Sequence, residues 1–448
     1  MKPVALMDAG FLLGERRNQP MHVGGLMLVK PPGPAMEFVE QVKEKCLRCT
    51  SAQPPFNQKL VRHLGVWFWI EDTEFDLESH FHHMSLPRPG RIRELLALVS
   101  KLHGNLMDRT KPLWEVYLID GLDDGRIAVY TKVHHAMMDG IAAVRLLQRA
   151  TTESPDQETT PFWTLAPRRR GGGSVNHSPH AAMMQAAAMA RRQFSSVPTV
   201  AREVVKSIQA RRHDPDHVSV FQAPRTIFNQ RVSGARRFAA QSFSLARMKA
   251  AGKRHDATLN DVVLAMCGSA LRRYLTDLNA LPDKPLVAMV PISLRKDDSE
   301  GGNQVAMALA NLATQVADPV ERLQTVVRSM NESKQRFARM SQSEILAYLG
   351  VVMAVHGVNF ALGINPAWQA FNIVISNVPG PKEVRYWNGG RVDGTYPVSI
   401  VMDGTALNIT LNSYAGNLEV GLIACRRVLP HMQKLLQYLE QGLAELEQ

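Results

Sequence analysis

The sequence predicts an α/β protein with two domains, and three observations support this prediction. The chain has 448 residues, which is more than one hydrophobic core usually supports. Its hydrophobic fraction of 45% and its charged fraction of 21% are those of an ordinary globular protein. Strand-like runs rich in β-branched residues occur in both halves, together with apolar runs at helical spacing. This composition excludes a collagen, a coiled coil and a wholly disordered chain.

Three elements are expected in the first half of the chain. Residues 38–49 form a helix-like stretch. Residues 126–133 are rich in β-branched and aromatic side chains and therefore predict a strand. Residues 141–150 predict a helix, because their large apolar side chains recur at helical spacing. These side chains belong to Ile141, Val144, Leu146 and Leu147.

A strongly basic region follows these elements. Between residues 165 and 240, thirteen Lys and Arg residues stand against three acids. The resulting net charge of +10 is nearly all of the chain's formal +11. The region contains the glycine-rich run Gly171–Ser174, an Ala- and Met-rich helix at 180–190, and a second helix that begins near Pro198. We therefore expect a basic helical linker over residues 161–220.

A helix and two strands are expected in the second half of the chain. An apolar stretch at 262–271 has helical spacing, and Thr258 is placed to cap this helix. Strands are expected at 285–294 and 371–377. Both halves therefore combine helices with strands.

A long uncharged segment lies near the second of these strands. Residues 345–381 contain no Asp, Glu, Lys or Arg, and residues 345–364 are long enough to span a membrane. However, His356, Asn359 and three glycines lower the hydrophobicity, and Pro366 follows soon after. We expect a buried or interfacial helix. It would serve as ordinary core, as an apolar wall for a ligand, or as a face resting on lipid.

The four cysteines do not form a disulfide framework in a chain of this length. Cys46 and Cys49 form a C-x-x-C at the end of a helix-like stretch, with no second pair to complete a zinc site. Cys267 and Cys425 lie in apolar surroundings and are expected in the core. We therefore expect neither a redox nor a metal site among them.

The most informative stretch is residues 134–140, with the sequence HHAMMDG, called the motif turn below. It lies between the strand predicted at 126–133 and the helix predicted at 141–150. Side chains alternate between the two faces of a strand, so His134 and His135 cannot both point the same way. One of them is therefore expected to face the chemistry, and the other to be packed on the opposite side.

The residues of the motif turn suit proton transfer. A neutral imidazole near pH 7 can accept a proton from a substrate hydroxyl or amine. Asp139 is expected to orient the turn by pairing with an arginine, as buried carboxylates usually must. Gly140 would allow a tight turn where a ligand approaches. The alternative is a histidine pair with only a surface or packing role. A metal site is not expected, because adjacent histidines diverge and no ligand cluster is nearby.

The pattern HHxxxDG resembles the CoA-dependent acyltransferase superfamily, which includes chloramphenicol acetyltransferase, plant alcohol acyltransferases and condensation domains of peptide synthetases. Further segments make the chain similar to the bacterial wax ester synthase/acyl-CoA:diacylglycerol acyltransferase family over nearly its whole length. The similarity is weakest between residues 151 and 220. The segments that carry it are Pro20–Gly25, Pro112–Glu115, Asn260–Val263, Pro291–Arg295 and Ser376–Pro381.

The resemblance implies two chloramphenicol-acetyltransferase-like α/β domains, with a tunnel and the active site between them. The first would cover residues 1–160 and carry the motif turn, and the second would cover residues 221–448. The resemblance assigns the general base to His135 and a supporting role to His134. Arg295, at the end of a predicted strand, is the candidate partner of Asp139.

Other residues are expected near the site because of the same resemblance. Asn260 would support the active site, although a capping or turn role is the simpler alternative. Asp261 is a candidate substrate-binding residue. Ser376, Asn377 and Gly380 end a strand and begin a turn. They would line the site from the second domain, or only shape that turn.

The implied reaction moves a long-chain acyl group from acyl-CoA to a long-chain alcohol or to diacylglycerol. Acyl-CoA is then a substrate, and no cofactor is expected. The chain has no nucleophile motif such as G-x-S-x-G, so direct transfer without an acyl-enzyme is expected. Two alternatives remain. One is a condensation-like reaction on carrier proteins, which the absence of a carrier or adenylation module disfavours. The other is a catalytically silent lipid-binding protein, which the intact motif disfavours.

The basic region has several candidate partners, namely anionic lipid headgroups, the phosphates of CoA, nucleic acid or only water. Nucleic acid is disfavoured, because the run has no recognition motif and no interleaved aromatic residues. Each basic residue near a charged membrane contributes roughly 1 kcal/mol. No secretory signal is evident, since Asp8 and Glu15 interrupt the first apolar residues. We expect a cytoplasmic protein, peripherally associated with the inner membrane or with lipid droplets.

Overall fold

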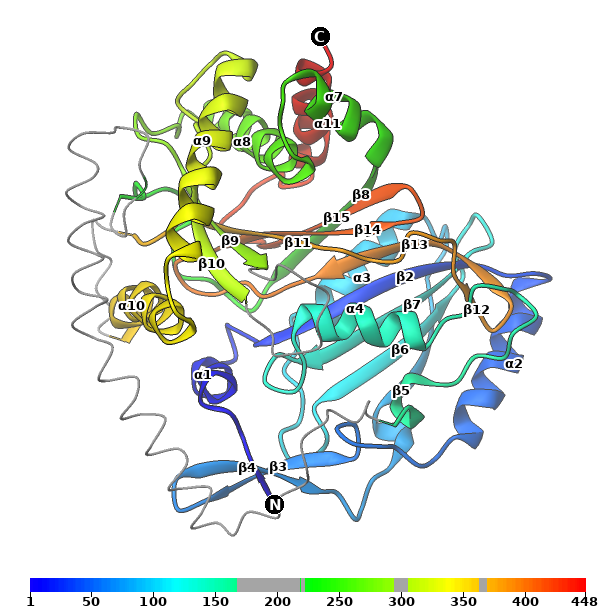
Figure 1. Cartoon of the computed structure of the whole chain (residues 1–448). Coiled ribbons are helices and arrows are strands. Elements are labelled where there is room, and N and C mark those ends of the chain that lie inside the picture. Colours follow the sequence, from blue (N-terminus) through cyan, green and yellow to red (C-terminus); the bar gives the residue numbers. More distant parts are fainter. Residues whose placement is uncertain (167–217, 219–221, 294–304, 362–368) are drawn as a thin grey trace.

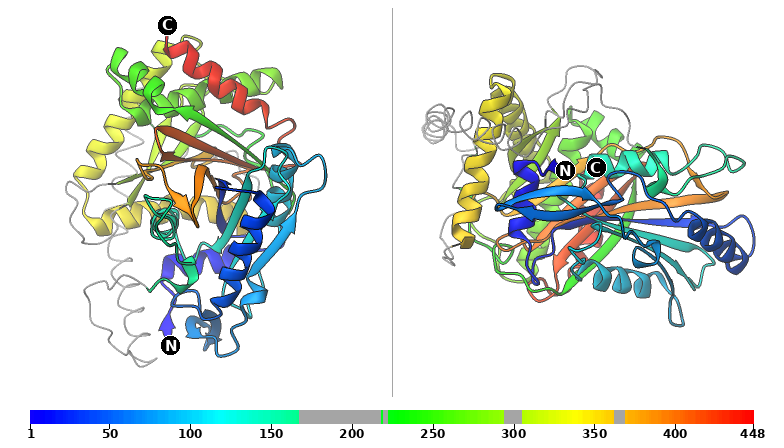
Figure 2. Two further views of the ribbon diagram at one scale, coloured as in Figure 1. Left: turned by 90° about the vertical axis from the view of Figure 1, so that its right-hand side faces the viewer. Right: turned by 90° about the horizontal axis from the view of Figure 1, so that it is seen from below.

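The structure is a computed structural model that describes residues 1–166, 218, 222–293, 305–361 and 369–448. Two six-stranded β-sheets, called the N-terminal and the C-terminal sheet below, form its centre. A small three-stranded sheet lies beneath the N-terminal sheet (Figure 1). Figure 2 shows that helix α2 and helix α10 lie on opposite sides of the molecule. The expected α/β class is confirmed.

The N-terminal sheet has the strand order β12-β13-β2-β7-β6-β5, and only the β5–β6 pair is parallel. Its strands are β2 (His22–Lys30), β5 (Phe81–Ser85), β6 (Trp114–Asp120), β7 (Ile127–His134), β12 (Tyr386–Trp387) and β13 (Gly390–Val398). Helices α2 (Ala35–Arg48), α3 (Ile92–His103) and α4 (Gly140–Arg149) pack around it.

The C-terminal sheet has the strand order β10-β9-β11-β14-β15-β8. Its strands are β8 (Arg236–Ser244), β9 (Val287–Ser293), β10 (Val305–Asn311), β11 (Ile373–Val378), β14 (Leu407–Tyr414) and β15 (Asn417–Cys425). Four helices gather on one side of this sheet (Figure 1). They are α7 (Leu245–Arg254), α8 (Leu259–Asp277), α9 (Pro319–Ala338) and α11 (Lys434–Leu446). Helix α8 is apolar around most of its circumference, which explains why it is almost entirely buried.

The two sheets do not follow the two halves of the chain. Strand β13 belongs to the second half, but it pairs with β2 and extends the N-terminal sheet. A single domain boundary at residue 221, as predicted, therefore does not account for β13, which follows that residue but belongs to the N-terminal sheet. Gly421 of β15 lies so close to β13 that a Cβ there would be 1.8 Å from the carbonyl oxygen of Pro397. The backbone N–H of Phe238 in β8 also donates to Ser100 Oγ of α3, at 2.8 Å.

Most of the elements predicted from the sequence are confirmed. The helices expected at 38–49, 141–150 and 262–271 correspond to α2, α4 and α8, and the expected strands correspond to β7, β9 and β11. Thr258 caps α8, as expected. Cys267 and Cys425 are buried in the core. The two helices expected in the basic region, at 180–190 and after Pro198, lie outside the described residues.

The first part of the uncharged segment lies in helix α10 (Gln342–Ala361), as predicted. Its described side chains at Ile345, Tyr348 and Val352 are buried, which fits the expected packing against protein. Among the helices that the structure describes, none is both long and apolar enough to cross a membrane.

A small sheet and the first helix support the motif turn from below. The sheet consists of β1 (Lys2–Pro3), β4 (Val66–Glu71) and β3 (Gln58–His63), and the helix is α1 (Leu6–Gly14). Their apolar side chains form one cluster with Ala136 of the motif turn. The buried members of this cluster are Val4, Leu12, Leu60, Trp69, Met107, Leu113 and Ala136. The N-terminal segments therefore hold the motif turn in place.

Candidate active site

The pleat of β7 determines which way each histidine points. Side chains two residues apart share one face of a strand, and directly paired residues of neighbouring strands share that face as well. Val129, Thr131 and Val133 all line a cavity, and His135 continues this series beyond the end of the strand. His134 belongs to the other series, which faces away from the cavity, and it is fully buried. The predicted divergence of the two histidines is confirmed.

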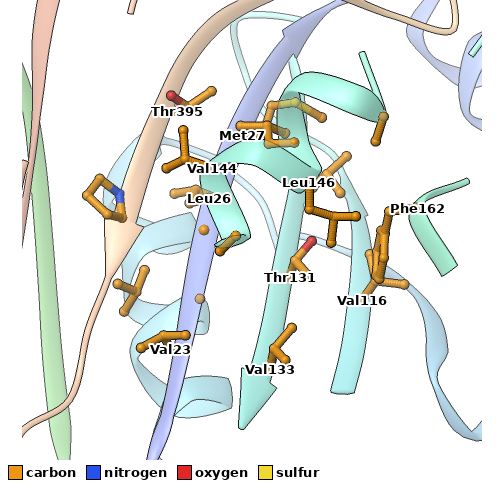
Figure 3. Close-up of a pocket in the computed structure, with 18 of the residues that line it drawn as sticks. Val23, Leu26, Met27, Val116, Thr131, Val133, Val144, Leu146, Phe162 and Thr395 are labelled. Atoms are coloured by element: carbon orange, nitrogen blue, oxygen red, sulfur yellow. The ribbon is translucent and has the colours of Figure 1, made fainter. Parts of the chain in front are cut away.

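The cavity lies against the N-terminal sheet and is closed by elements from both halves of the chain. Figure 3 shows side chains of β2, β6 and β7 on one side, with Val144 and Leu146 of α4 and Thr395 of β13 around them. Strands β11 and β14 contribute further residues from the C-terminal sheet. The cavity volume of about 240 Å³ is far above the ~10–15 Å³ that one buried water requires. The cavity is therefore large enough for an organic ligand, and its lining is mainly apolar.

His135 is held in place by its backbone and by an aromatic ring. Its N–H donates to the carbonyl oxygen of Met21 at 2.9 Å, which extends the β2–β7 pairing by one residue. Its imidazole stacks on Phe11 of α1, with ring centroids 4.0 Å apart and an interplanar angle of 19°. These contacts restrict both the position and the tilt of the ring.

The surroundings of His135 favour a neutral imidazole. Burial lowers its pKa to about 4, while its own backbone and the carboxylate of Asp139 partly oppose this shift. Its Nδ1 atom is buried, and no group of the described residues meets it in hydrogen-bond geometry. A neutral ring beside a cavity can accept a proton, so His135 is suited to act as a general base at neutral pH.

His134 takes part in a polar network behind the sheet. The N–H of Ala136 donates to its Nδ1 at 3.1 Å, so that the ring hydrogen lies on Nε2. This Nε2 is 3.4 Å from Oε1 of Glu15. Although burial alone would raise the pKa of Glu15, contacts with His134, the Met21 N–H and Arg109 lower it. Arg109 donates to Glu15 at 2.9 and 3.0 Å and to the carbonyl oxygen of Leu12 at 2.7 Å.

A second set of polar contacts begins at His22, which pairs with His134 in the sheet, and reaches the second half of the chain. Nε2 of His22 donates to the carbonyl oxygen of His103 at 2.5 Å. The His103 ring accepts from the Tyr130 hydroxyl at 2.7 Å and donates to the carbonyl oxygen of Ser399 at 2.9 Å. Burial lowers the pKa of His103 to about 3, so this ring is also neutral. Lys132, buried beside these rings, forms an ion pair of 2.6 Å with Glu115.

Asp139 does not occupy the buried position that was expected. It is exposed, and its Oδ1 accepts from the N–H of Ala142 at 2.7 Å, which makes it the N-cap of α4. A carboxylate at a helix N-terminus needs no burial, because it satisfies an otherwise unpaired backbone N–H and faces the positive end of the helix dipole. The expected orienting role thus takes the form of a cap. The candidate partner Arg295 lies outside the described residues.

The other predicted site residues are divided between the cavity and local structure. Gly140 and Ser376 line the cavity, whereas Asn377 and Gly380 are absent from its lining. A Cβ at Gly380 would lie 2.2 Å from the carbonyl oxygen of Ser413, so this glycine serves the close approach of β14. The residues of α8 predicted near the site do not line the cavity either.

Asp261 has a clear structural role in α8. Its Oδ2 accepts from the N–H and the hydroxyl of Thr258, at 3.0 and 2.6 Å, while Thr258 Oγ1 accepts from the N–H of Asp261. This reciprocal pair is a capping box. Asn260, its neighbour in the first turn, is partly buried. The helix start therefore accounts for Asp261, and substrate contact by either residue stays a prediction.

Sequence reasoning missed two residues beside the histidines. Phe11 and Glu15 lie more than a hundred residues away in the chain, and only the docking of α1 brings them to the motif turn. A lone Phe and a lone Glu carry no local signal for such a role. The described residues also contain no group of three or more His, Cys, Asp or Glu side chains placed to hold a metal ion.

Comparison with known proteins places the whole chain in one family. Residues 4–263 match the model of the wax ester synthase/diacylglycerol acyltransferase catalytic domain, and residues 301–447 match the model of the C-terminal domain of the same family. An O-acyltransferase of Acinetobacter baylyi is 47% identical, with 100% of this chain and 97% of that protein covered. A probable diacylglycerol O-acyltransferase of Mycobacterium tuberculosis is 44% identical, with 98% of each covered.

Solved structures agree with these relatives. The wax ester synthase/diacylglycerol acyltransferase from Marinobacter aquaeolei has a TM-score of 0.81 at 45% identity, with 100% of this chain and 99% of that chain covered. The first condensation domain of a calcium-dependent antibiotic synthetase has a TM-score of 0.59 at 14% identity, with 100% and 95% covered. This second likeness shows a shared fold alone. The chloramphenicol-acetyltransferase-like architecture is thereby confirmed.

The exposed cap position of Asp139 leads to a prediction about stability. We expect Asp139→Ala to lower the free energy of unfolding by about 1 kcal/mol, because one helix N-cap is lost. Asp139→Asn, which can still accept from the Ala142 N–H, should retain most of the stability. Urea unfolding of both variants measures the difference. A loss of roughly 3 to 5 kcal/mol in the alanine variant would instead indicate a buried charge pair.

Proposed function

Because the chain belongs to the wax ester synthase/diacylglycerol acyltransferase family, we propose that it transfers a long-chain acyl group from acyl-CoA to a long-chain alcohol or to diacylglycerol. The observation that carries this proposal is a neutral, cavity-facing imidazole at the edge of an apolar cavity. Apolar walls suit both acyl chains, while the imidazole supplies the proton transfer that ester formation needs. The products are a wax ester or triacylglycerol, and free CoA.

In the proposed reaction, His135 takes the proton from the acceptor hydroxyl while that oxygen attacks the thioester carbonyl carbon. A tetrahedral oxyanion forms. It collapses with cleavage of the carbon–sulfur bond, so that the new ester remains and the CoA thiolate leaves. The thiolate then receives the proton from His135, which returns the imidazole to its neutral state. Phe11 and the Met21 carbonyl keep the ring in position through both proton transfers.

Direct transfer is the route that the cavity residues favour. Cys46 also lines the cavity, but burial raises the pKa of its thiol to about 12. Its thiolate fraction at neutral pH is therefore very small, and the thiolate is the nucleophilic form of cysteine. Acyl-CoA and the acceptor would accordingly be bound together, and no acyl-enzyme would form.

The proposed substrates also indicate where in the cell the protein acts. Long-chain alcohols and diacylglycerol are held in lipid, so we infer that the protein is peripherally associated with a membrane or a lipid droplet. The basic linker expected at 161–220 is one candidate for this contact. Most of this linker lies outside the described residues. This linker holds nine Lys and Arg residues against three acids, and the resulting net charge of +6 would be attracted to anionic lipid headgroups.

The activity is tested by mixing the purified protein with palmitoyl-CoA and either hexadecanol or dipalmitoylglycerol, and following release of the CoA thiol. The expected result is thiol release that depends on the acceptor, with matching formation of ester. Absence of thiol release with every alcohol and diglyceride would support a silent lipid-binding protein instead.

Substitution of the two histidines separates their roles. His135→Ala should lose about 10²- to 10⁴-fold in turnover with little change in stability, because general-base help is lost. His134→Ala should mainly lose stability, because it removes a fully buried ring and leaves the Ala136 N–H without its acceptor. Initial rates and melting curves of both variants measure these effects. A folded but inactive His134 variant beside an active His135 variant would reverse the assignment.

The lowered pKa of His135 predicts the pH dependence of catalysis. The pKa of about 4 lies below the ordinary value of 6.5, so the neutral base persists as the pH falls from 7 towards 5. We expect kcat/KM to stay level over this range and to fall only as the pH approaches 4. An acid limb centred near 6.5 would contradict the proposed shielding of the ring.

Stability has its own pH dependence, which this experiment must control. The buried rings of His22, His103 and His135 are neutral in the folded state and have lowered pKa values. The unfolded chain therefore binds more protons, and folding stability decreases as the pH falls below about 6.5. Circular dichroism at each pH identifies the range in which the protein is folded, and rates are compared within that range.

The cavity wall predicts a change in chain-length preference. Gly25 pairs with Thr131 and lines the cavity, and a Cβ there meets no atom within 4 Å. We expect Gly25→Leu to fold and to reduce turnover of hexadecanol more than that of butanol, because the added side chain occupies the cavity. Gly24→Leu is the matched control. Its Cβ would lie 2.7 Å from the Thr131 carbonyl oxygen, so it should lose stability instead. Equal rates with both alcohols in Gly25→Leu would contradict the prediction.

A further inference from the structure

The tip of the β3–β4 hairpin carries an exposed leucine in a conformation that leucine disfavours. Leu64 and Gly65 are the two loop residues, with φ angles of 47° and 83°. A type I′ turn requires positive φ at both positions and normally uses Asn, Asp or Gly at the first. Leu64 is nevertheless 82% exposed, so it gains little from packing. Neither the turn nor the core of the protein explains a leucine at this position.

The residues around Leu64 combine apolar, aromatic and cationic side chains. Val66 is also exposed, whereas Trp67, the next residue in β4, is half-buried because it packs against the cluster that contains Trp69. The guanidinium of Arg62 lies 5.7 Å from the centre of the Trp67 ring, and Arg62 itself is exposed. Protruding apolar side chains beside tryptophan and arginine are typical of surfaces that lie at a lipid–water boundary.

A second exposed leucine belongs to the same region. The guanidinium of Arg109 also lies near Trp67, 6.0 Å from the ring centre, and it donates to the carbonyl oxygen of Leu12 in α1. The next residue, Leu13, is 71% exposed. Arg17, which closely follows α1, is exposed too. The acidic residue Glu71 pairs with Gln58, at the end of the hairpin opposite to Leu64. The tip region is therefore cationic as well as apolar.

We propose that this tip region, Leu64 with Val66, Leu13 and Arg62, docks the protein on an anionic lipid surface. Separate protruding leucines suit insertion among lipid headgroups, and the arginine complements their negative charge. The inner face of the hairpin supports the same conclusion, because Leu60 and Trp69 pack in one cluster with Ala136 of the motif turn. Docking at the tip would bring the active site to the surface that holds its apolar substrates.

The inference rests on the proposed function only through this choice of substrates, and it is tested without turnover. The full-length protein is sedimented with vesicles of 70% phosphatidylcholine and 30% phosphatidylglycerol. We expect Leu64→Asn to weaken partitioning about tenfold, because one inserted apolar side chain is lost. Its melting temperature should be unchanged or higher, since asparagine tolerates positive φ. Leu13→Gln should also weaken binding.

Met36→Gln provides the control. Met36 is 62% exposed at the start of α2, and α2 contributes no residue to the cluster that joins the hairpin to the motif turn, so its substitution should leave binding unchanged. Arg62→Gln should weaken binding to the anionic vesicles while pure phosphatidylcholine vesicles bind both proteins equally. Thiol release with a soluble short alcohol reports the proposed function separately, and it should not change in Leu64→Asn.

Two results would overturn the inference. One is vesicle binding by Leu64→Asn that equals binding by the wild type. The other is a wild-type dimer in light scattering that Leu64→Asn converts to a monomer, because the tip would then contact a second copy of the chain.

Discussion

The alternation of side chains along β7 is the constraint on which the site depends. A pleated strand sends neighbouring residues to opposite faces, so the sheet gives His135 to the cavity and His134 to the packed side. The hydrogen bond from His135 to Met21 carries this order one residue beyond the end of the strand. A slip of one residue in the β2–β7 pairing would exchange the two rings, so the register of this pair is a condition for the site.

The two faces of the N-terminal sheet provide different electrostatic surroundings. The cavity face is mainly apolar, and burial there lowers the pKa of His135, so that its ring is neutral and free to accept a proton at neutral pH. The opposite face buries oppositely charged side chains next to each other, as in Glu15 with Arg109 and Lys132 with Glu115. Losing one member of such a pair leaves an uncompensated buried charge, which costs roughly 3 to 5 kcal/mol. The polar contacts thus stabilise the arrangement in which His135 faces the cavity and His134 is packed behind the sheet.

The C-terminal half completes the site through β13. This strand pairs with β2 while it lies against β15, and Gly421 permits the close contact. Thr395 of β13 and Ser376 of β11 then enter the cavity wall. The His103 ring reinforces the same junction by donating to the Ser399 carbonyl oxygen. Because both halves contribute to one sheet and one cavity, neither half contains a complete site.

The sequence by itself determined the local features of this protein. Helical spacing and β-branched runs predicted α2, α4, α8, β7, β9 and β11. The HHxxxDG pattern together with the further family segments indicated the family, and this resemblance assigned the base to the histidine that faces the cavity. These features depend on residues close together in the chain, where period and capping chemistry are visible. Tertiary structure alone decided the contacts between distant segments. Only folding brings Phe11 and Glu15 to the motif turn, moves β13 into the N-terminal sheet, and leaves Asp139 exposed as a helix cap. The pattern of residues along a helix or strand predicts that element, because it follows the element's own period. The burial of each side chain and its contacts depend on which other elements pack against it.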